Sequence, residues 1–276
     1  MATRETAVER AAFGSDGGVR LPSLPSPRRL AGLVVPLLLL AGWQLAVNAG
    51  IYSTAQLPAP LDVVAALREL LGREILWANI GASVQRVAIG FGFGALAGVI
   101  VGLLIGGSQV AETLLAPTVQ AIRAVPSLAW VPLLILWMGI GEGPKLVLIA
   151  IGAFFPVCAA LISGIRSIDR KLVEAGRAYG LAGPSLAAGV MLPAALPSLF
   201  TGLRLGLAQA WLFLVAAELI GASRGLGFLL VDAQNSGRAD IIVLSIVLLA
   251  LLGTGTDWLL KLAESRLLRW ADTYRG

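Results

Sequence analysis

Six apolar runs of about membrane-crossing length divide the chain, and they constrain its fold more than any other feature. A helix needs about 20 apolar residues to cross the hydrocarbon core of a bilayer. Within that core an irregular backbone facing lipid would leave polar groups unpaired, so such runs must be helical. The sequence therefore predicts an all-α membrane protein with six transmembrane helices, at about residues 30–49, 83–106, 112–138, 146–165, 196–220 and 241–258.

The composition agrees with this prediction and excludes several kinds of function. Hydrophobic residues make up 57% of the 276 residues and charged residues only 13%, whereas soluble domains carry about 25% charged residues. The chain has no histidine, which is the commonest general base and a frequent metal ligand. No basic run with interleaved aromatic residues is present, so we expect no nucleic acid partner. The spans also lack paired carboxylates and metal-ligand clusters, so we expect neither enzyme activity nor a metal site.

The basic residues predict which side of the membrane each segment faces. With six spans, both termini lie on the same side as the central loop, which we define as residues 166–193. That side carries thirteen of the 21 Lys and Arg residues and the opposite side six, while Arg123 and Arg204 lie inside or near spans. Because basic residues favour the cytoplasm, we expect both termini and the central loop to be cytoplasmic.

Two polar tails flank the predicted membrane domain at 30–260. Residues 1–29 are rich in Gly, Pro, Ser and Arg, and such a composition buries too little apolar surface to fold. We therefore predict a disordered cytoplasmic tail there and a second cytoplasmic tail at 261–276. A cleaved signal peptide is the alternative at the start, but the following apolar run is long and no small-residue cleavage site closes it.

Glycines recur every four residues in the second apolar run. One helix face would carry all five, and a face of small residues lets another helix approach closely. A nucleotide-binding glycine fingerprint is the alternative, but it needs a preceding strand in a βαβ unit, which the sequence lacks. The pattern therefore predicts close helix packing at Gly90, Gly94, Gly98, Gly102 and Gly106.

The central loop is the most polar interior segment. Its apolar residues recur at helical spacing between charged ones, which predicts a short amphipathic helix at 169–179. Gly180, Gly183 and Pro184 then end that helix, and a second short helix is expected up to Pro193. A helix this short needs something to pack against. The plain alternative is a connecting loop such as every multi-span protein contains.

The same segment resembles the EAA loop of ABC importer permeases, whose pattern is E-A-A, three residues, G, nine residues and I-x-L-P. Gly176 and Val190 depart from that pattern by residues of similar size and polarity. The resemblance implies that the short helix is a coupling helix, which docks into a groove of a cytoplasmic ATPase. It carries the ATPase-coupling role over to the matching residues Glu174, Ala175, Gly176, Gly180 and Pro193, with Glu174 and Gly180 at the contact itself.

Further motifs resemble the sulfonate, nitrate and taurine branch of these permeases. They are IRAVPSLAWVP at 122–132, GIGEGPK at 139–145, FFP at 154–156, AEL at 217–219 and GLG at 225–227. The resemblance, which covers about residues 30–276, implies a type I ABC importer permease fold. It also implies ATP-driven import of a small solute, such as an aliphatic sulfonate, taurine or nitrate, across the cytoplasmic (inner) membrane of a prokaryote.

The resemblance also implies the partners. The chain would form a homodimer in membrane lipid, contact two cytoplasmic ATPase subunits and receive its solute from an extracytoplasmic binding protein. No stretch of the sequence reads G-x-x-x-x-G-K-[ST], so this chain has no phosphate-binding loop of its own. We therefore expect no cofactor on this chain, with ATP and Mg bound by the partner ATPase.

Four positions are candidates for lining or gating the pathway. Charge at the bilayer centre costs about 2.5–3.5 kcal/mol on insertion scales, so charged residues there should face protein or water. Arg123 and Arg204 could line a route for an anion, or they could sit near span ends and pair to lock helices. Glu218 could be a structural or a gate partner. Pro126 could break its helix at the pathway, or only kink it for packing.

Two other functions fit the same composition. A secondary transporter needs no ATPase, but inverted repeats and paired broken helices are typical of it, and the sequence shows no such symmetry. A membrane enzyme that modifies lipid would carry a polar catalytic cluster near one interface, and no such cluster is visible. Both alternatives therefore lack a supporting motif.

Overall fold

The structure is a computed structural model that describes residues 27–53 and 56–269, and all regular secondary structure in these ranges is helical. The elements in chain order are α1 (Pro27–Asn48), α2 (Pro60–Gly72), α3 (Ile75–Gly107), α4 (Gln109–Ala124), η1 (Ser127–Trp130), α5 (Val131–Met138), α6 (Glu142–Arg166), α7 (Arg170–Ala178), α8 (Gly183–Leu186), η2 (Ala187–Met191), α9 (Leu192–Gly221), α10 (Leu226–Asn235) and α11 (Ala239–Leu267). The predicted tails at 1–29 and 261–276 lie partly outside the described residues. Where they are described, residues 27–29 already belong to α1 and α11 continues to Leu267, so α1 and α11 extend into the two predicted tails.

Four helices in the described part of the chain are long and apolar enough to cross a membrane: α3, α6, α9 and α11. They coincide with the second, fourth, fifth and sixth predicted spans. The first predicted span corresponds to α1, whose described apolar part, Val34–Asn48, is shorter than the about 20 residues that a crossing helix needs. The count of six spans therefore stays a prediction, with four or five supported by length and composition.

The third predicted span, 112–138, is not one continuous helix. The chain bends by 89° between Gln109–Ala124 and Ser127–Met138, so the two pieces count at most as one broken span. Pro126 lies at this bend, and the residue before it, Val125, has an extended conformation with φ −73° and ψ 126°. Proline disfavours helical geometry in the preceding residue and donates no backbone N–H, so Pro126 breaks the helix here.

Helix α6 is the centre of the bundle, packed between α3 and α9. The glycine face of α3 lies directly on α6, so the predicted close helix packing is confirmed and α6 is identified as the partner. A Cβ atom added at Gly90 would lie 2.7 Å from Ile149 Cβ, and one added at Gly98 would lie 2.8 Å from the carbonyl oxygen of Phe154. Both distances are shorter than real Cβ contacts, so only glycine permits this approach of the two helices.

The other side of α6 is packed almost as closely. A Cβ atom added at Gly206 of α9 would lie 3.0 Å from the carbonyl oxygen of Ala153. Val157 and Leu161 of α6 and Leu214 of α9 are fully buried. Helices α3, α6 and α9 therefore form one tightly packed unit, and α6 cannot shift without its neighbours.

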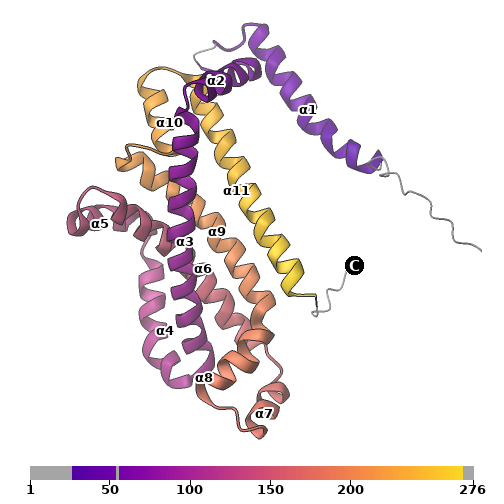
Figure 1. Ribbon diagram of the computed structural model, residues 1–276, viewed down its shortest axis with the longest axis vertical. Helices are drawn as coiled ribbons and strands as arrows, with labels where there is room; N and C mark the ends of the chain where they lie inside the picture. Colours follow the sequence, from indigo (N-terminus) through magenta and orange to yellow (C-terminus); the bar gives the residue numbers. More distant parts are fainter. Residues whose placement is uncertain (1–26, 54–55, 270–276) are drawn as a thin grey trace, which may run out of the picture.

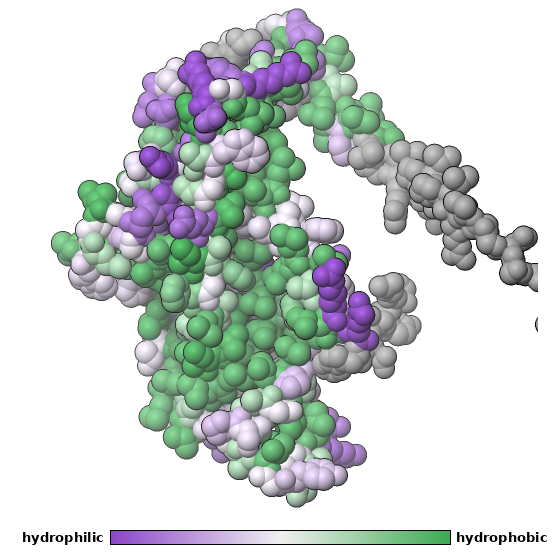
Figure 2. Space-filling model, in the orientation of Figure 1, coloured by the Kyte–Doolittle hydropathy of each residue, from purple (hydrophilic) through white to green (hydrophobic). Residues whose placement is uncertain are grey.

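The molecule has two ends that differ in character (Figure 1). One end carries α7 and α8, and we call it the loop end; the opposite end carries α2 and α10. Figure 2 shows hydrophobic residues over most of the visible middle and many hydrophilic residues at the opposite end. Helix α1 projects away from the bundle and contacts α2. Its apolar side chains, among them Val35, Leu39 and Leu45, are exposed in the single chain.

Candidate functional site

The short amphipathic helix predicted in the central loop is present as α7, Arg170–Ala178. Asp169 caps it, because its side-chain oxygen accepts a hydrogen bond of 2.9 Å from the backbone N–H of Lys171. Glu174 is exposed and pairs with Arg170 one turn earlier, with 2.8 Å between Arg170 Nε and Glu174 Oε1. Ala175 is also exposed. The helix thus presents charged and small residues outward.

Gly180 ends α7 in the way that the sequence predicts. Its φ is +82°, a left-handed conformation that residues with a side chain rarely adopt. The N–H of Gly180 donates to the carbonyl of Arg177 at 2.9 Å, and the N–H of Leu181 donates to the carbonyl of Gly176 at 3.1 Å. This pair of hydrogen bonds is the Schellman motif. Nothing lies within 4 Å of a Cβ atom added at Gly180, so backbone conformation, not space, requires glycine.

Gly176 faces the opposite way and is buried. A Cβ atom added there would lie 2.9 Å from Leu186 Cδ1 and 3.0 Å from Val190 Cγ2. The approach of α7 to α8 and η2 therefore explains why glycine stands where the related pattern has alanine. It also fixes α7 to the segment that leads into α9.

The second short helix does not end at Pro193. Helix α8 continues through η2, a π turn at Ala187–Met191, directly into α9, and Pro193 lies in the first turn of α9. The reason is local: a proline lacks a backbone donor, and the widened hydrogen-bond pattern of a π turn accommodates that loss without ending the helix. The central loop is therefore continuous with a predicted membrane span.

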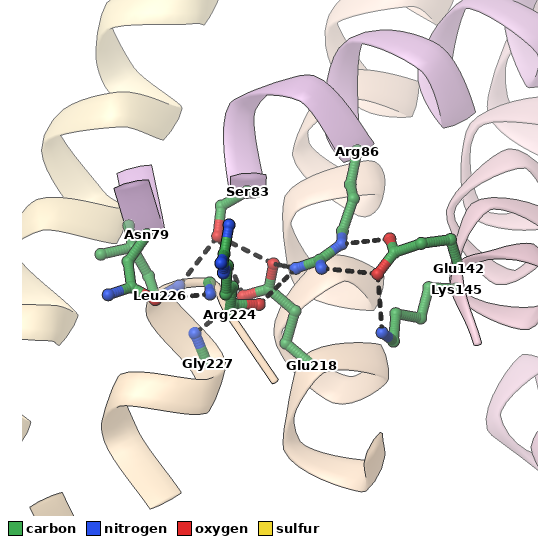
Figure 3. A network of polar contacts seen from close by, with 10 residues as sticks. Asn79, Ser83, Arg86, Glu142, Lys145, Glu218, Arg224, Leu226 and Gly227 are labelled. Carbon is green, nitrogen blue, oxygen red and sulfur yellow. Dashed lines mark hydrogen bonds and ion pairs between the residues drawn. The ribbon is translucent and has the colours of Figure 1, made fainter. Parts of the chain in front are cut away.

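A second polar region lies at the opposite end, where α3, α6 and α9 meet (Figure 3). Arg86 of α3 is 7% exposed and forms a bidentate ion pair with Glu142 of α6, at 2.6 and 2.7 Å. Its Nη1 also donates to Glu218 of α9 at 2.7 Å. Lys145 adds a bond to Glu142 at 3.0 Å. One arginine thus ties three helices together.

Glu218 is 1% exposed, and besides the bond from Arg86 it accepts bonds from a side-chain hydroxyl and from a backbone N–H. Its carboxylate accepts hydrogen bonds from Ser83 Oγ at 2.8 Å and from the N–H of Gly227 at 2.8 Å. Because Gly227 lies in the first turn of α10, the negative charge is placed at the positive end of a helix dipole. Two roles were considered for Glu218, a structural partner and a gate partner, and this geometry fits a structural partner.

The neighbouring glycines fit around this carboxylate. Gly225 has φ +128°, and its N–H donates to Asn79 Oδ1 at 2.7 Å. A Cβ atom added at Gly227 would lie 2.6 Å from Glu218 Cβ. The GLG motif is thus explained by close backbone approach to Glu218.

Arg204 belongs to neither region. It forms a bidentate pair with Asp257, with Nε–Oδ1 2.8 Å and Nη2–Oδ2 3.0 Å, and so links α9 to α11. This geometry matches the alternative in which Arg204 locks helices together. Asp257 was not singled out in the sequence, although its position on the last apolar run was a usable signal.

A further ion pair cluster joins α2 to the start of α11. Arg238 Nη2 lies 2.8 Å from Glu69 Oε2 and 2.8 Å from Asp240 Oδ2. The hydrogen bond from Arg238 lowers the pKa of Glu69 below its usual value. The cluster holds the surface helix α2 against the bundle.

Arg123 lines a cavity of about 300 Å³ between α4 and α6. Helix α4 has 16 residues and is therefore about 24 Å long, which is less than the about 30 Å of a hydrocarbon core. It begins at the loop end, so its last turn, which carries Arg123, lies near the middle of the molecule (Figure 1). The mid-helix residues Phe155 and Cys158 of α6 line the same cavity.

No carboxylate of the described chain lies within ion-pair distance of Arg123. A charge at the bilayer centre costs about 2.5–3.5 kcal/mol on insertion scales. The C-terminal position on α4 offsets only about 0.3–1 kcal/mol of that cost. Arg123, whose side chain is exposed in the single chain, is therefore the site residue whose charge is least compensated by other described residues.

The sequence reasoning missed most of the opposite-end network. Arg86 and Lys145 were counted only as basic residues on one side of the membrane, and Asn79 and Ser83 were not considered. The available signal was the presence of four charged residues within or beside apolar runs, namely Arg86, Glu142, Lys145 and Glu218. The described residues include no group of three or more His, Cys, Asp or Glu side chains that could hold a metal ion.

Known proteins are similar to this chain over most of its length. The family described as "Binding-protein-dependent transport system inner membrane component" matches residues 94–269. The chain is 40% identical over 247 residues to the "Putative aliphatic sulfonates transport permease protein SsuC" of Bacillus subtilis (strain 168), covering 90% of each chain. It is 33% identical over 237 residues to the "Taurine transport system permease protein TauC" of Escherichia coli (strain K12), covering 84% of this chain and 86% of TauC.

A solved structure has a similar fold. A chain of the inward-facing MetNI methionine ABC transporter superposes with a TM-score of 0.61 at 23% identity, covering 72% of this chain and 97% of that chain. At this identity the similarity bears on the fold alone. It agrees with the helical type I ABC importer permease fold that the sequence predicts.

Proposed function

The chain belongs to the family of binding-protein-dependent transport system inner membrane components, and from this membership we propose that it is the membrane-spanning permease subunit of an ATP-driven importer. The observation that carries the proposal is the central loop. It combines the EAA-like spacing with a short helix that packs on one face and leaves the other exposed.

We propose α7 as the coupling helix that receives an ATPase. Tyr179 is 89% exposed and Leu172 is 48% exposed, so both side chains are available for contact with a partner. Glu174, Ala175 and Gly180 lie on or beside this exposed part of α7, whereas Gly176 is the residue through which α7 packs on α8 and η2. A push on α7 would therefore be passed on as a movement of the packed segment.

The path of that movement follows from the continuity of the chain. Pro193 stands where η2 becomes α9, and α9 packs on α6. Because α6 is also packed closely on α3, displacement of α7 would be transmitted to three helices together. A change between inward and outward access requires two states that nucleotide favours differently.

The proposed partners follow from the missing phosphate-binding loop and from the exposed apolar side chains of this chain. Hydrolysis of ATP with Mg would occur on two cytoplasmic ATPase subunits, because this chain has no phosphate-binding loop. A second copy of the chain would complete the pathway, and the exposed apolar side chains of α1 are available for such an interface. An extracytoplasmic binding protein would deliver the solute at the opposite end, with both termini and the central loop in the cytoplasm of a prokaryote.

The solute is proposed to be a small organic anion, in line with the names of SsuC and TauC. Arg123 and Pro126 are proposed to line the pathway at the broken third span. Arg204 and Glu218 are engaged with Asp257 and Arg86, and we propose that they hold the helices around the pathway without contacting the solute.

The experiment is ATP-dependent uptake by the complex reconstituted with its ATPase and binding protein. Gly180→Ala should abolish uptake while the protein remains in the membrane, since it disturbs the end of α7. Gly189→Ala is the matched control, because Gly189 is exposed and a Cβ atom there would lie 3.8 Å from its nearest neighbour. Normal uptake by Gly180→Ala would contradict the coupling role. Uptake that collapses with the proton gradient at constant ATP would favour a secondary transporter instead.

A further inference from the structure

The cavity that Arg123 lines has both polar and apolar wall residues. Its polar groups are Gln120 and Arg123 of α4 and Ser163 and Arg166 of α6. Gln120 and Arg123 are three residues apart, so they share one face of α4. The remaining wall is mostly apolar and includes Phe155 and Ile162. A cation and an apolar wall within one cavity fit a molecule with a charged head and a hydrocarbon tail.

The other cation of the cavity is already neutralised. Arg166 forms an ion pair of 2.6 Å with Glu112, at the loop end of the cavity. Arg123, in contrast, has no such partner among the described residues. Arg123 is exposed in the single chain and lies at the end of the cavity away from the loop end, so its uncompensated charge is open to an anion that enters the cavity.

The length of the cavity suits a short chain. Phe155 and Arg166 are eleven residues apart on α6, so the lining extends over about 16 Å of that helix. The volume of about 300 Å³ is at the lower end of small-molecule sites, which are about 300–1,000 Å³. A sulfonate or carboxylate with a few carbon atoms fits this space, whereas a bare inorganic anion would leave the apolar wall unused.

We infer that this cavity selects, within the membrane domain, oxyanions that carry an apolar chain over inorganic anions of the same charge. The inference rests on the proposed transport function and deepens it, since it places part of the solute selection in this chain. Arg123 binds the head group, and Phe155 and Ile162 contact the chain. Each added methylene that is buried should strengthen binding about fourfold.

The first test measures the charge of the cavity without a transported solute. Ser163, which is exposed in the cavity, is replaced by cysteine in a Cys158→Ala background, and the full complex is labelled in membrane vesicles. Anionic and cationic methanethiosulfonate reagents of similar size are compared. Arg123→Gln should lower the anionic-to-cationic rate ratio by at least about threefold, whereas Arg123→Lys and the distant control Arg68→Gln should preserve it. An unchanged ratio in Arg123→Gln would overturn the inference.

The second test measures selection by protection of the same cysteine. Methanesulfonate, ethanesulfonate and propanesulfonate should protect it at concentrations that fall about fourfold for each methylene, and nitrate at equal ionic strength should not protect. Phe155→Ala should flatten this dependence on chain length. Equal protection by nitrate and propanesulfonate, or no protection by any of them, would overturn the inference.

Uptake separates the two proposals. ATP-dependent uptake without chain-length-dependent protection would overturn the inference and leave the proposed importer function intact. Chain-length-dependent protection with no ATP-dependent uptake would support the cavity and contradict the importer function.

Discussion

The two ends of the molecule are built in contrasting ways. At the opposite end, Arg86 and Glu218 are buried and engaged in ion pairs and hydrogen bonds from three helices and the start of α10. At the loop end, α7 is fixed by one buried glycine, while Glu174 and Tyr179 are exposed. The difference indicates that one end is closed by its own contacts, whereas the other is open to contact from outside.

The largest expected effect is the removal of Glu218. In Glu218→Ala, the guanidinium of Arg86 stays buried with one partner fewer, and breaking a buried pair costs about 3–5 kcal/mol. We expect a large fall in the thermal unfolding temperature of the purified protein in detergent. Glu174→Ala is the matched control at the loop end and should leave that temperature nearly unchanged. Equal losses in the two variants would remove the contrast between the ends.

The second effect is at Gly180. Any other residue would be forced into a left-handed conformation at a cost of about 1–2 kcal/mol. Gly180→Ala should therefore lower stability less than Glu218→Ala does, yet it should abolish uptake. Thermal unfolding and ATP-dependent uptake, measured on the same preparations, check both parts. A Gly180→Ala variant with normal unfolding would show that the turn tolerates a side chain.

A smaller effect on stability is expected from the pair between Arg170 and Glu174. Both side chains are largely exposed, and exposed pairs contribute about 0.2–1 kcal/mol. Glu174→Gln should thus alter unfolding very little, while it weakens the ATPase contact. The measurement is pull-down of the ATPase subunit by the wild type and by Glu174→Gln, with Lys171→Gln as the control. Undiminished binding by Glu174→Gln would exclude Glu174 from the contact.

The smallest effect is a dependence on pH at the opposite end. Arg238 lowers the pKa of Glu69 in the folded protein, so the ionised carboxylate stabilises the fold above its unfolded pKa of about 4.5. That contribution is lost as the pH falls through the lower, folded pKa. The unfolding temperatures of wild type and Glu69→Gln should differ slightly at about pH 6 and converge at about pH 3. A difference that grows on acidification would contradict this sign.

Much of the helical framework is predictable from local pattern. The apolar runs locate α3, α6, α9 and α11 to within a few residues, except that α3 begins earlier and α11 ends later than the runs suggest. The amphipathic pattern gives α7 and its end at Gly180. The four-residue glycine spacing predicts that α3 packs closely on another helix, although not that this helix is α6. Each of these depends on residues close together in the sequence.

What the sequence leaves open depends on residues far apart or on context. Pro126 breaks a helix whereas Pro117 and Pro156 lie inside intact ones, so a proline alone does not decide. The contact between Arg86 and Glu218 joins positions 132 residues apart. The short helix α10 was likewise not predicted from any local pattern.

The most direct measurement concerns the exposed side chain at the end of α7. Tyr179→Cys, in a Cys158→Ala background, is cross-linked in native membranes with its ATPase and binding protein present. The account predicts a cross-link to the nucleotide-hydrolysing subunit, with no reaction toward a membrane-impermeant thiol reagent added outside the cell. Labelling from outside, or a complete absence of the ATPase among the cross-linked products, would contradict it.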